Sequence, residues 1–360
     1  QPMTPNAMRE FILHWHRAIS LVLNPINPDY LADEAEKLLD ELKQKKSLRQ
    51  LATNPLLCGV ICALHHDRHG YLPNNRTEIY EATCQMLLER RDLERKVAEK
   101  DAALKSLSYT DKRVFLNDLA QWMMLNGQTV IQKSQIFKLF RDKIHYLPDL
   151  REKGLQEDAL LDYFLERSGL LQQIGPNEVH FAHRTFQEYM AAKEFVDKDS
   201  MGFLKKNAGN DYWNETILLA LGLCSNASSR LFISDLLKVA RKLEDMGSTM
   251  PATRLYLLVI RGCDTMRQIP PEIQEIIEGK IKAFFPPDHR EKRAALVESG
   301  DLALPFLAKE PNRTIKDDLY CALTLLQMKS EEAYSLLLDY LLDKRVGFIR
   351  SLSMLLRQLD

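Results

Sequence analysis

The sequence predicts a mainly α-helical protein that contains a winged-helix domain and ends in a series of paired helices. Nearly all of its apolar patterns have helical spacing, with apolar residues three or four positions apart. Two β-like runs, residues 170–174 and 178–181, flank a turn at residues 175–177 and predict a hairpin. From residue 291 onward the helical patterns are short and come in pairs, which favours a HEAT-like α-solenoid.

The composition is that of an ordinary globular protein. Of 360 residues, 45% are hydrophobic and 28% are charged, and the net charge of −1 steers the chain toward neither nucleic acid nor an anionic membrane. The six cysteines form no CxxC pair, which predicts reduced core thiols in a cytoplasmic protein. We find no signal peptide and no apolar run long enough to cross a bilayer. The chain starts with glutamine in mid-pattern, so we expect a piece of a longer polypeptide.

Residues 1–106 are predicted to form a helical domain. Thr4 caps the first helix and Pro5 occupies its first position, where no N–H is needed. A second helix is predicted over residues 29–42. Because the residue before a proline is pushed out of the α region, a short helix should break at Asn54 and a new one should start at Pro55. A long helix is expected from about residue 76 into the charged run 89–96.

Residues 107–198 contain the parts of a winged helix. Three helices, a short strand and a terminal hairpin are predicted, with Gly169 as a left-handed C-cap. The predicted order is a helix capped at Thr110 and Asp111, a β-like run at 129–131, a helix capped at Ser134, a helix at 155–167, and the hairpin.

The rest of the chain shows helical patterns and no strand pattern. Residues 199–290 are predicted as a second helical region and residues 291–360 as HEAT-like repeats that could act as a sensor. The expected helices cover 213–223, 232–243, 253–261, 273–284, 293–298, 303–308, 316–327, 333–342 and 346–358.

Motifs for hydrolysis or metal binding are missing. The sequence has no GxxxxGK[ST] phosphate loop, GxSxG elbow, HExxH pair or EF-hand loop, so no catalytic residue is predicted. Four possible ligands lie within two helical turns, and three of them could share a face: Cys62, His66 and His69, with His65 beside them. With no fourth ligand in reach, they are interpreted as ordinary side chains at a helix end, and no metal is predicted.

His183 and Pro55 are the candidate binding residues. Val179 and Phe181 alternate as one strand face, which places His183 at the N-cap of the following helix. A helix N-terminus attracts anions, and an imidazole there can donate a hydrogen bond to a phosphate oxygen. The alternative is a purely structural capping histidine. Pro55 has two interpretations as well, because a proline ring can pack against adenine but more often only starts a helix.

Two blocks of sequence resemble known proteins. Residues 51–57 (LATNPLL) and 72–80 (LPNNRTEIY) resemble the helical region that follows the nucleotide-binding core of NACHT-type NTPases. Residues 164–171 (FLERSGLL) and 179–192 (VHFAHRTFQEYMAA) resemble their winged-helix domain, with the more specific pattern F-x-H-x-[ST]-F-Q-E-[YF]. The resemblance covers roughly the first 200 residues, counted from these motif positions.

The resemblance implies the regulatory portion of a STAND-class signalling ATPase, such as NOD-like receptors and bacterial NACHT defence proteins. It implies ADP or ATP with Mg²⁺ bound between an upstream nucleotide-binding domain, the helical domain and the winged helix. By motif, Pro55 would contact adenine and His183 the β-phosphate, which latches the inactive state. A trigger at the C-terminal helices would release the latch, permit nucleotide exchange and allow homo-oligomerisation, in innate immune or antiphage defence. A bacterial source is expected from the HEAT-like tail.

The chain departs from this family at its start. The phosphate-binding loop, the Mg²⁺-binding acidic strand and any effector domain would have to lie upstream of Gln1. We therefore expect this chain alone to bind nucleotide weakly or not at all and not to hydrolyse it.

Two alternatives are non-enzymatic: a winged helix that reads DNA, and an α-solenoid scaffold. A DNA reader needs exposed arginine or lysine on the recognition helix and the wing. The wing turn at 175–178 has no basic residue, and residues 155–167 carry more acids than bases. A plain scaffold does not account for the hairpin or for His183.

Overall fold

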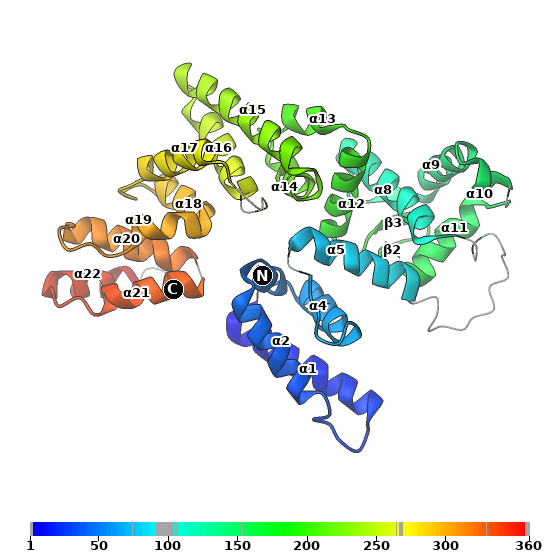
Figure 1. The fold of residues 1–360 in the computed structure, drawn as a ribbon, viewed down its shortest axis with the longest axis horizontal. Helices are drawn as coiled ribbons and strands as arrows, with labels where there is room; N and C mark the ends of the chain where they lie inside the picture. Colours follow the sequence, from blue (N-terminus) through cyan, green and yellow to red (C-terminus); the bar gives the residue numbers. More distant parts are fainter. Residues whose placement is uncertain are drawn as a thin grey trace. The chain divides into compact units, whose positions relative to one another are not determined.

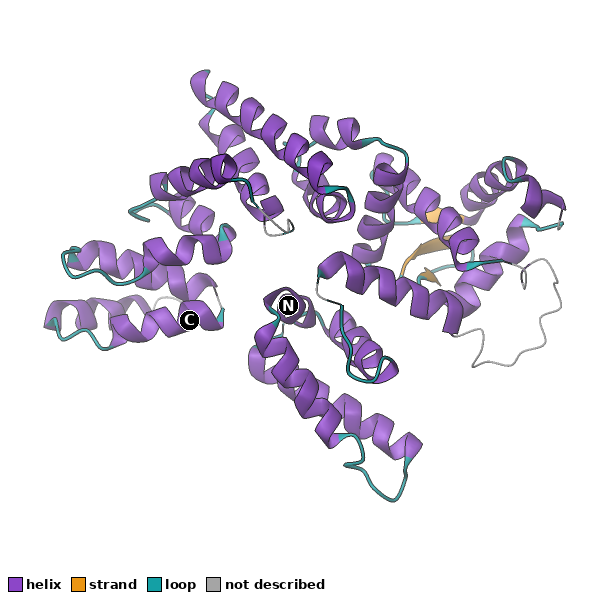
Figure 2. Cartoon of the chain, in the orientation of Figure 1, coloured by secondary structure: helices purple, strands orange, loops and turns teal. Residues whose placement is uncertain are grey.

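The computed structural model describes residues 3–73, 75–90, 104, 107–152, 154–263, 265, 269–328 and 330–356. It confirms the mainly α fold: in the described residues, helices surround a small antiparallel sheet (Figures 1 and 2). The chain divides into two compact units, residues 1–200 and 201–360. The finer division at residues 106, 198 and 290 stays a prediction.

The first helices begin largely where the sequence placed them. Thr4 Oγ1 accepts a hydrogen bond from the backbone N–H of Ala7 at 3.2 Å, so α1 starts at Pro5 as predicted. The second helix starts later than residue 29, because turns occupy residues 27–31. The elements are α1 (Pro5–Leu23), α2 (Ala32–Gln44), α3 (Lys46–Ala52), α4 (Pro55–Asp67) and α5 (Arg76–Gln85).

The helix that starts at Arg76 changes its winding near its end. The α5 segment passes into a π-helical turn over Met86–Arg90. Most of the predicted charged run at 89–96 lies outside the described residues.

The predicted winged helix is present between α5 and the end of the first unit. Strand β3 lies between β1 and β2 and pairs antiparallel with both, with Val179 opposite Ile131 and Phe181 opposite Leu171. Gly169 has the left-handed conformation that was predicted, with φ of 65°. The elements are α8 (Tyr109–Leu125), β1 (Ile131–Gln132), α9 (Lys133–His145), α10 (Pro148–Glu152), α11 (Glu157–Tyr163) with a π-turn (Phe164–Ser168), β2 (Leu171–Gln173), β3 (Glu178–Phe181) and α12 (Arg184–Asp197).

Two predicted helix caps in this domain were wrong. Helix α8 is capped by Ser108 rather than Thr110, because Ser108 and Asp111 form a reciprocal capping box. Helix α9 is not capped by Ser134: its first N–H, on Lys133, donates to the carbonyl of Asn177 at 2.8 Å. Pairing between β1 and β3 thus fixes the start of α9.

A shared apolar core holds the winged helix together. Helix α12 packs along α8, and both bury their apolar faces. The largest buried side chains of this core are Phe115, Phe140, Phe164, Phe186, Tyr189 and Phe195. Because α12 packs against α8 along its length, this core also fixes the position of the N-terminal end of α12.

The second unit consists of helices in the described residues. Its elements are α13 (Met201–Lys206), a 3₁₀ turn (Asp211–Trp213), α14 (Asn214–Leu223), α15 (Asn226–Asp245), α16 (Thr249–Cys263), α17 (Pro271–Ala283), α18 (Arg290–Glu298), a 3₁₀ turn (Gly300–Ala303), α19 (Leu304–Leu307), α20 (Ile315–Met328), α21 (Glu331–Leu341) and α22 (Val346–Leu356). A side chain at Gly262 would meet Leu221 at 2.9 Å, so α14 and α16 approach closely. Their assignment as HEAT-like repeats stays a prediction. Among described residues, helices long and apolar enough to cross a membrane are absent.

Candidate functional site

The starts of helices α4 and α12 meet at one contact. Asn54 is the N-cap of α4 and His183 is the N-cap of α12. Asn54 Nδ2 lies 3.2 Å from His183 Nε2, although the two residues are 129 positions apart. Pro55, the other predicted site residue, follows Asn54 directly and is exposed at the first position of α4. The structure therefore places both predicted residues at one junction.

Strand β3 sets the position of His183. Val179 and Phe181 point into the core, and the N–H of Ala182 donates to the carbonyl of Leu170 at 2.8 Å. His183 then has an extended backbone, as an N-cap residue does. Its Nδ1 atom lies 2.8 Å from Thr185 Oγ1 and 3.2 Å from the backbone nitrogen of Thr185.

The contacts select one tautomer of His183. Asn54 Oδ1 accepts from the N–H groups of Leu56 and Leu57, so its Nδ2 group faces the imidazole. An amide nitrogen can only donate, and His183 Nε2 must therefore carry a lone pair. The ring proton of the neutral form then lies on Nδ1 and is donated to Thr185 Oγ1, and in this tautomer Nδ1 no longer accepts from the backbone N–H of Thr185, 3.2 Å away.

This environment favours the neutral imidazole. Burial lowers the pKa of His183 from its ordinary value of 6.5. The Asn54 donor acts in the same direction, because a proton on Nε2 would point at the amide N–H. The contribution of neutral His183 to folding is complete above pH 6.5 and is lost as the pH falls through the lower folded-state pKa.

Replacing Asn54 with aspartate is expected to raise the pKa of His183 above 6.5. One carboxylate oxygen would keep capping α4, and the other would accept a hydrogen bond from Nε2–H and favour the imidazolium form. Proton NMR titration of the His183 ring in the isotope-labelled chain measures the change.

The matched control is Asn75→Asp. Asn75 is the N-cap of α5, where its Oδ1 accepts from the N–H of Glu78, and it does not contact His183. Its replacement should leave the pKa of His183 unchanged. An unshifted pKa in Asn54→Asp would show that the two caps do not meet in solution.

A second polar cluster fixes helix α12 against α5 and α8. Glu81 of α5 accepts hydrogen bonds from Tyr189 Oη at 2.5 Å and Tyr109 Oη at 2.9 Å, and pairs with Arg113 at 3.1 Å. Burial alone would raise the pKa of Glu81, but these two hydroxyl groups and the Arg113 charge lower it below its ordinary value. Glu81 is therefore ionised and joins three helices.

Sequence reasoning missed the partners of His183. Asn54 and Thr185 stand in the quoted motifs, but neither was given a role. Local signals for both were present: Asn54 occupies an N-cap position before Pro55, and Thr185 lies two residues after a predicted capping histidine. Glu81 gave no local signal, because its partner Tyr189 is 108 positions away.

Helix α11 does not carry the basic side chains of a DNA-recognition helix. Helix α11 carries Glu157, Asp158 and Asp162 and no lysine or arginine. A recognition helix and wing need basic side chains to contact phosphates and bases.

Comparison with known proteins gives an independent result. Residues 76–195 match the family described as "Winged helix-turn-helix domain C-terminal to NACHT". A stretch of 189 residues, 52% of this chain, is 22% identical to mouse NLR family CARD domain-containing protein 4 and covers 16% of that relative. The chain thus spans less than a fifth of the relative's length. Residues 76–195 are thus a winged helix-turn-helix domain of the type that lies C-terminal to NACHT, and the chain is similar over about half its length to an NLR family protein.

Proposed function

We propose that this chain is the regulatory and sensor portion of a NACHT-type signalling ATPase. The winged helix closes over ADP held by an upstream nucleotide-binding domain and keeps the protein inactive. Recognition of a trigger by the C-terminal helices opens this arrangement, permits exchange of ADP for ATP with Mg²⁺, and allows homo-oligomerisation. The setting is innate immune or antiphage defence in the cytoplasm. The matched family and the printed name of the mouse relative support this class.

The contact between Asn54 and His183 carries the proposal. It joins two helix N-termini, and each carries a partial positive charge from its aligned peptide groups, although the N–H groups of Leu56 and Leu57 are already capped by Asn54. Two such ends at one junction attract an anion more strongly than one. Bound ADP would supply a phosphate group there, with Pro55 exposed beside it for the adenine ring.

His183 can form hydrogen bonds both without and with bound nucleotide, because its ring proton can lie on either nitrogen. In the structure Nδ1–H donates to Thr185 Oγ1 and Nε2 accepts from Asn54. In the nucleotide-bound state Nε2–H would donate to a phosphate oxygen, and Nδ1 would accept from the backbone N–H of Thr185, which already lies 3.2 Å away. Every polar group of the ring has a partner in either state.

The energy that such a latch requires is modest. A hydrogen bond to a charged group contributes about 1.5–3 kcal/mol. This amount shifts a two-state equilibrium by roughly one to two powers of ten, which is enough to hold a closed state and to let a trigger reverse it.

The test is His183→Ala in the longer protein that includes the nucleotide-binding domain. We expect ADP to dissociate about 10- to 100-fold faster and signalling to occur without a trigger, because the contact of about 1.5–3 kcal/mol is lost. Retained ADP and basal signalling measure the two effects.

His180→Ala is the matched control. His180 lies on the same hairpin, three residues earlier and on the strand face opposite Val179 and Phe181. Its replacement should leave ADP retention unchanged. If His183→Ala also retains ADP and shows no signalling without a trigger, the latch proposal is wrong.

A further inference from the structure

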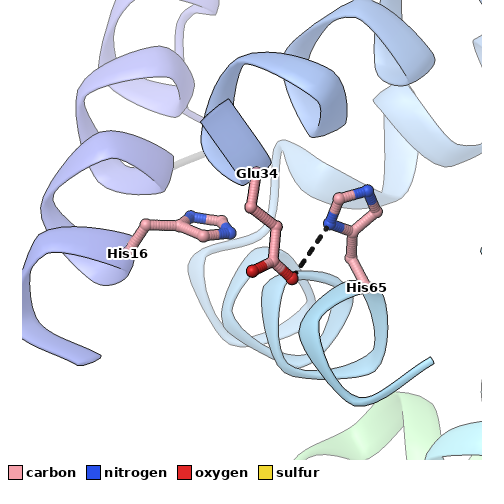
Figure 3. A group of neighbouring side chains, drawn as sticks. All are labelled: His16, Glu34 and His65. Atoms are coloured by element: carbon pink, nitrogen blue, oxygen red, sulfur yellow. Dashed lines mark ion pairs between the residues drawn. The ribbon is translucent and has the colours of Figure 1, made fainter. Parts of the chain in front are cut away.

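A buried cluster of two histidines and a glutamate lies among the first helices. His16 comes from α1, Glu34 from α2 and His65 from α4, and their side chains point toward one another (Figure 3). One ligand atom from each lies within 4.8 Å of the others. Both histidines are 1% exposed. The cluster is separate from the junction of Asn54 and His183 described above.

Two ring nitrogens in this cluster have no partner. His16 Nδ1 lies 2.8 Å from the carbonyl oxygen of Ile12, which can only accept, so the ring proton is on Nδ1. His16 Nε2 then carries a lone pair, and it is buried without a hydrogen bond. His65 Nδ1 is also buried without a hydrogen bond and lies 3.9 Å from Glu34 Oε1. Buried polar atoms without partners are costly and require an explanation.

Outer contacts hold the three side chains in place. The Ile12 carbonyl orients His16, and Glu41 Oε2 lies 3.8 Å from the far nitrogen of His65. Glu34 accepts from His66 Nδ1 at 3.1 Å. Metal-binding histidines characteristically give their second nitrogen to a carbonyl or carboxylate, as His16 does here with the Ile12 carbonyl.

The protonation state also suits a metal. Burial lowers the pKa of both His16 and His65 from the ordinary value of 6.5, although the Glu34 carboxylate acts in the opposite direction. Neutral imidazole nitrogens and an ionised carboxylate are the forms that bind metal ions. A surface hollow reaches one member of the cluster, His16, and it is also lined by Leu13, His14, Arg17, Ser20, Pro28, Asp29, Ala32 and Ala35.

We propose that His16 Nε2, His65 Nδ1 and the Glu34 carboxylate bind one divalent transition-metal ion of the zinc class, with water as the fourth ligand. Two nitrogens and one carboxylate oxygen match the ligand preferences of Zn²⁺, whereas Mg²⁺ and Ca²⁺ prefer sets made entirely of oxygen. The ion ties α1, α2 and α4 together. It thereby stabilises the helix whose first turn begins at Asn54 and Pro55.

The sequence places Cys62, His66 and His69 together at the end of α4, where a fourth metal ligand is missing. The structure instead brings ligands from α1 and α2 to His65. His66 contacts Glu34 of the cluster, and Cys62 is engaged with the neighbouring Cys58.

The test uses the 360-residue chain after removal of metal with a chelator. Titration with Zn²⁺ should show one tight site per chain and raise the thermal unfolding midpoint. Co²⁺ should give the intense visible absorption of a four-coordinate ion, and Mg²⁺ should produce neither effect. His16→Gln and Glu34→Gln should each weaken Zn²⁺ binding by at least about 100-fold, because outer-shell changes alone cost 10- to 100-fold.

Two further variants make the result specific. Glu41→Gln should weaken Zn²⁺ binding by about 10-fold, as an outer-shell change does. His145→Gln removes an exposed histidine of α9, which does not line the hollow beside His16, and should change nothing. The proposal is overturned if the metal-free chain binds neither Zn²⁺ nor Co²⁺. It is equally overturned if Glu34→Gln, folded by circular dichroism, binds Zn²⁺ as tightly as His145→Gln does.

Discussion

Replacing Tyr189 with alanine is expected to destabilise the first unit by about 3–5 kcal/mol. Tyr189 is 1% exposed, its ring stacks on Tyr80 at 5.2 Å, and its hydroxyl donates to Glu81 at 2.5 Å. Alanine removes the ring and leaves a cavity between α5, α8 and α12. Hydrogen exchange of peptides from these helices measures the loss separately from residues 201–360.

Two related variants separate packing from hydrogen bonding. Tyr189→Phe keeps the stacked ring and loses only the hydroxyl, so a smaller cost of about 1.5–3 kcal/mol is expected. Tyr146→Ala removes a tyrosine that is 78% exposed, and it should change stability by less than about 0.5 kcal/mol. If Tyr189→Ala costs no more than Tyr146→Ala, the packing of α5 against α12 does not hold the winged helix in place.

The consequence for the site follows from the position of Tyr189 on α12. His183 caps the same helix, six residues earlier in the chain. The junction with Asn54 can form only while α12 keeps its position relative to the first helices. Tyr189 and Glu81 are therefore expected to influence the His183 contact without touching it.

Local chemistry explains why the winged helix could be predicted from the sequence. Gly169 has the left-handed conformation that a helix C-cap needs, and the turn at 175–177 joins two short strands. The alternation of Val179 and Phe181 placed His183 at the start of α12. Each of these signals depends on residues a few positions apart, which a sequence displays directly.

The choice between neighbouring caps could not be predicted in the same way. Thr110 and Ser108 are both hydroxyl residues close to the start of α8. Only the reciprocal bonds between Ser108 and Asp111 decide in favour of Ser108. Likewise, the start of α9 depends on the carbonyl of Asn177, which a distant strand supplies.

The spacing of apolar residues along the sequence did not reveal the buried polar side chains. The apolar face of α1 buries residues such as Met8 and Ile12. The same face also buries His16 and Ser20, which periodicity of apolar residues does not predict. Glu34, which lies beside His16, and the N–H of Leu31, which donates to Ser20, come from the neighbouring segment and depend on tertiary packing.

In the longer protein with its nucleotide-binding domain, Asn54→Asp is expected to weaken ADP binding by about 100-fold or more. The substitution places a carboxylate beside His183, at the position where the phosphate of ADP would bind. Two negative charges held against each other cost several kcal/mol. The cap of α4 is preserved, because aspartate caps as well as asparagine does. Equilibrium binding of labelled ADP measures the loss, and Asn75→Asp should bind ADP normally.

The two variants at this junction should differ in signalling although both lose ADP. His183→Ala removes every contact of the ring, so the closed arrangement loses its latch and signalling begins without a trigger. Asn54→Asp replaces the phosphate contact with an ion pair to His183, which holds α4 and α12 together without nucleotide. It should therefore stay silent. If both variants signal without a trigger, bound ADP keeps the protein inactive through contacts other than His183. If Asn54→Asp binds ADP as tightly as the unchanged protein, the phosphate of ADP does not reach His183.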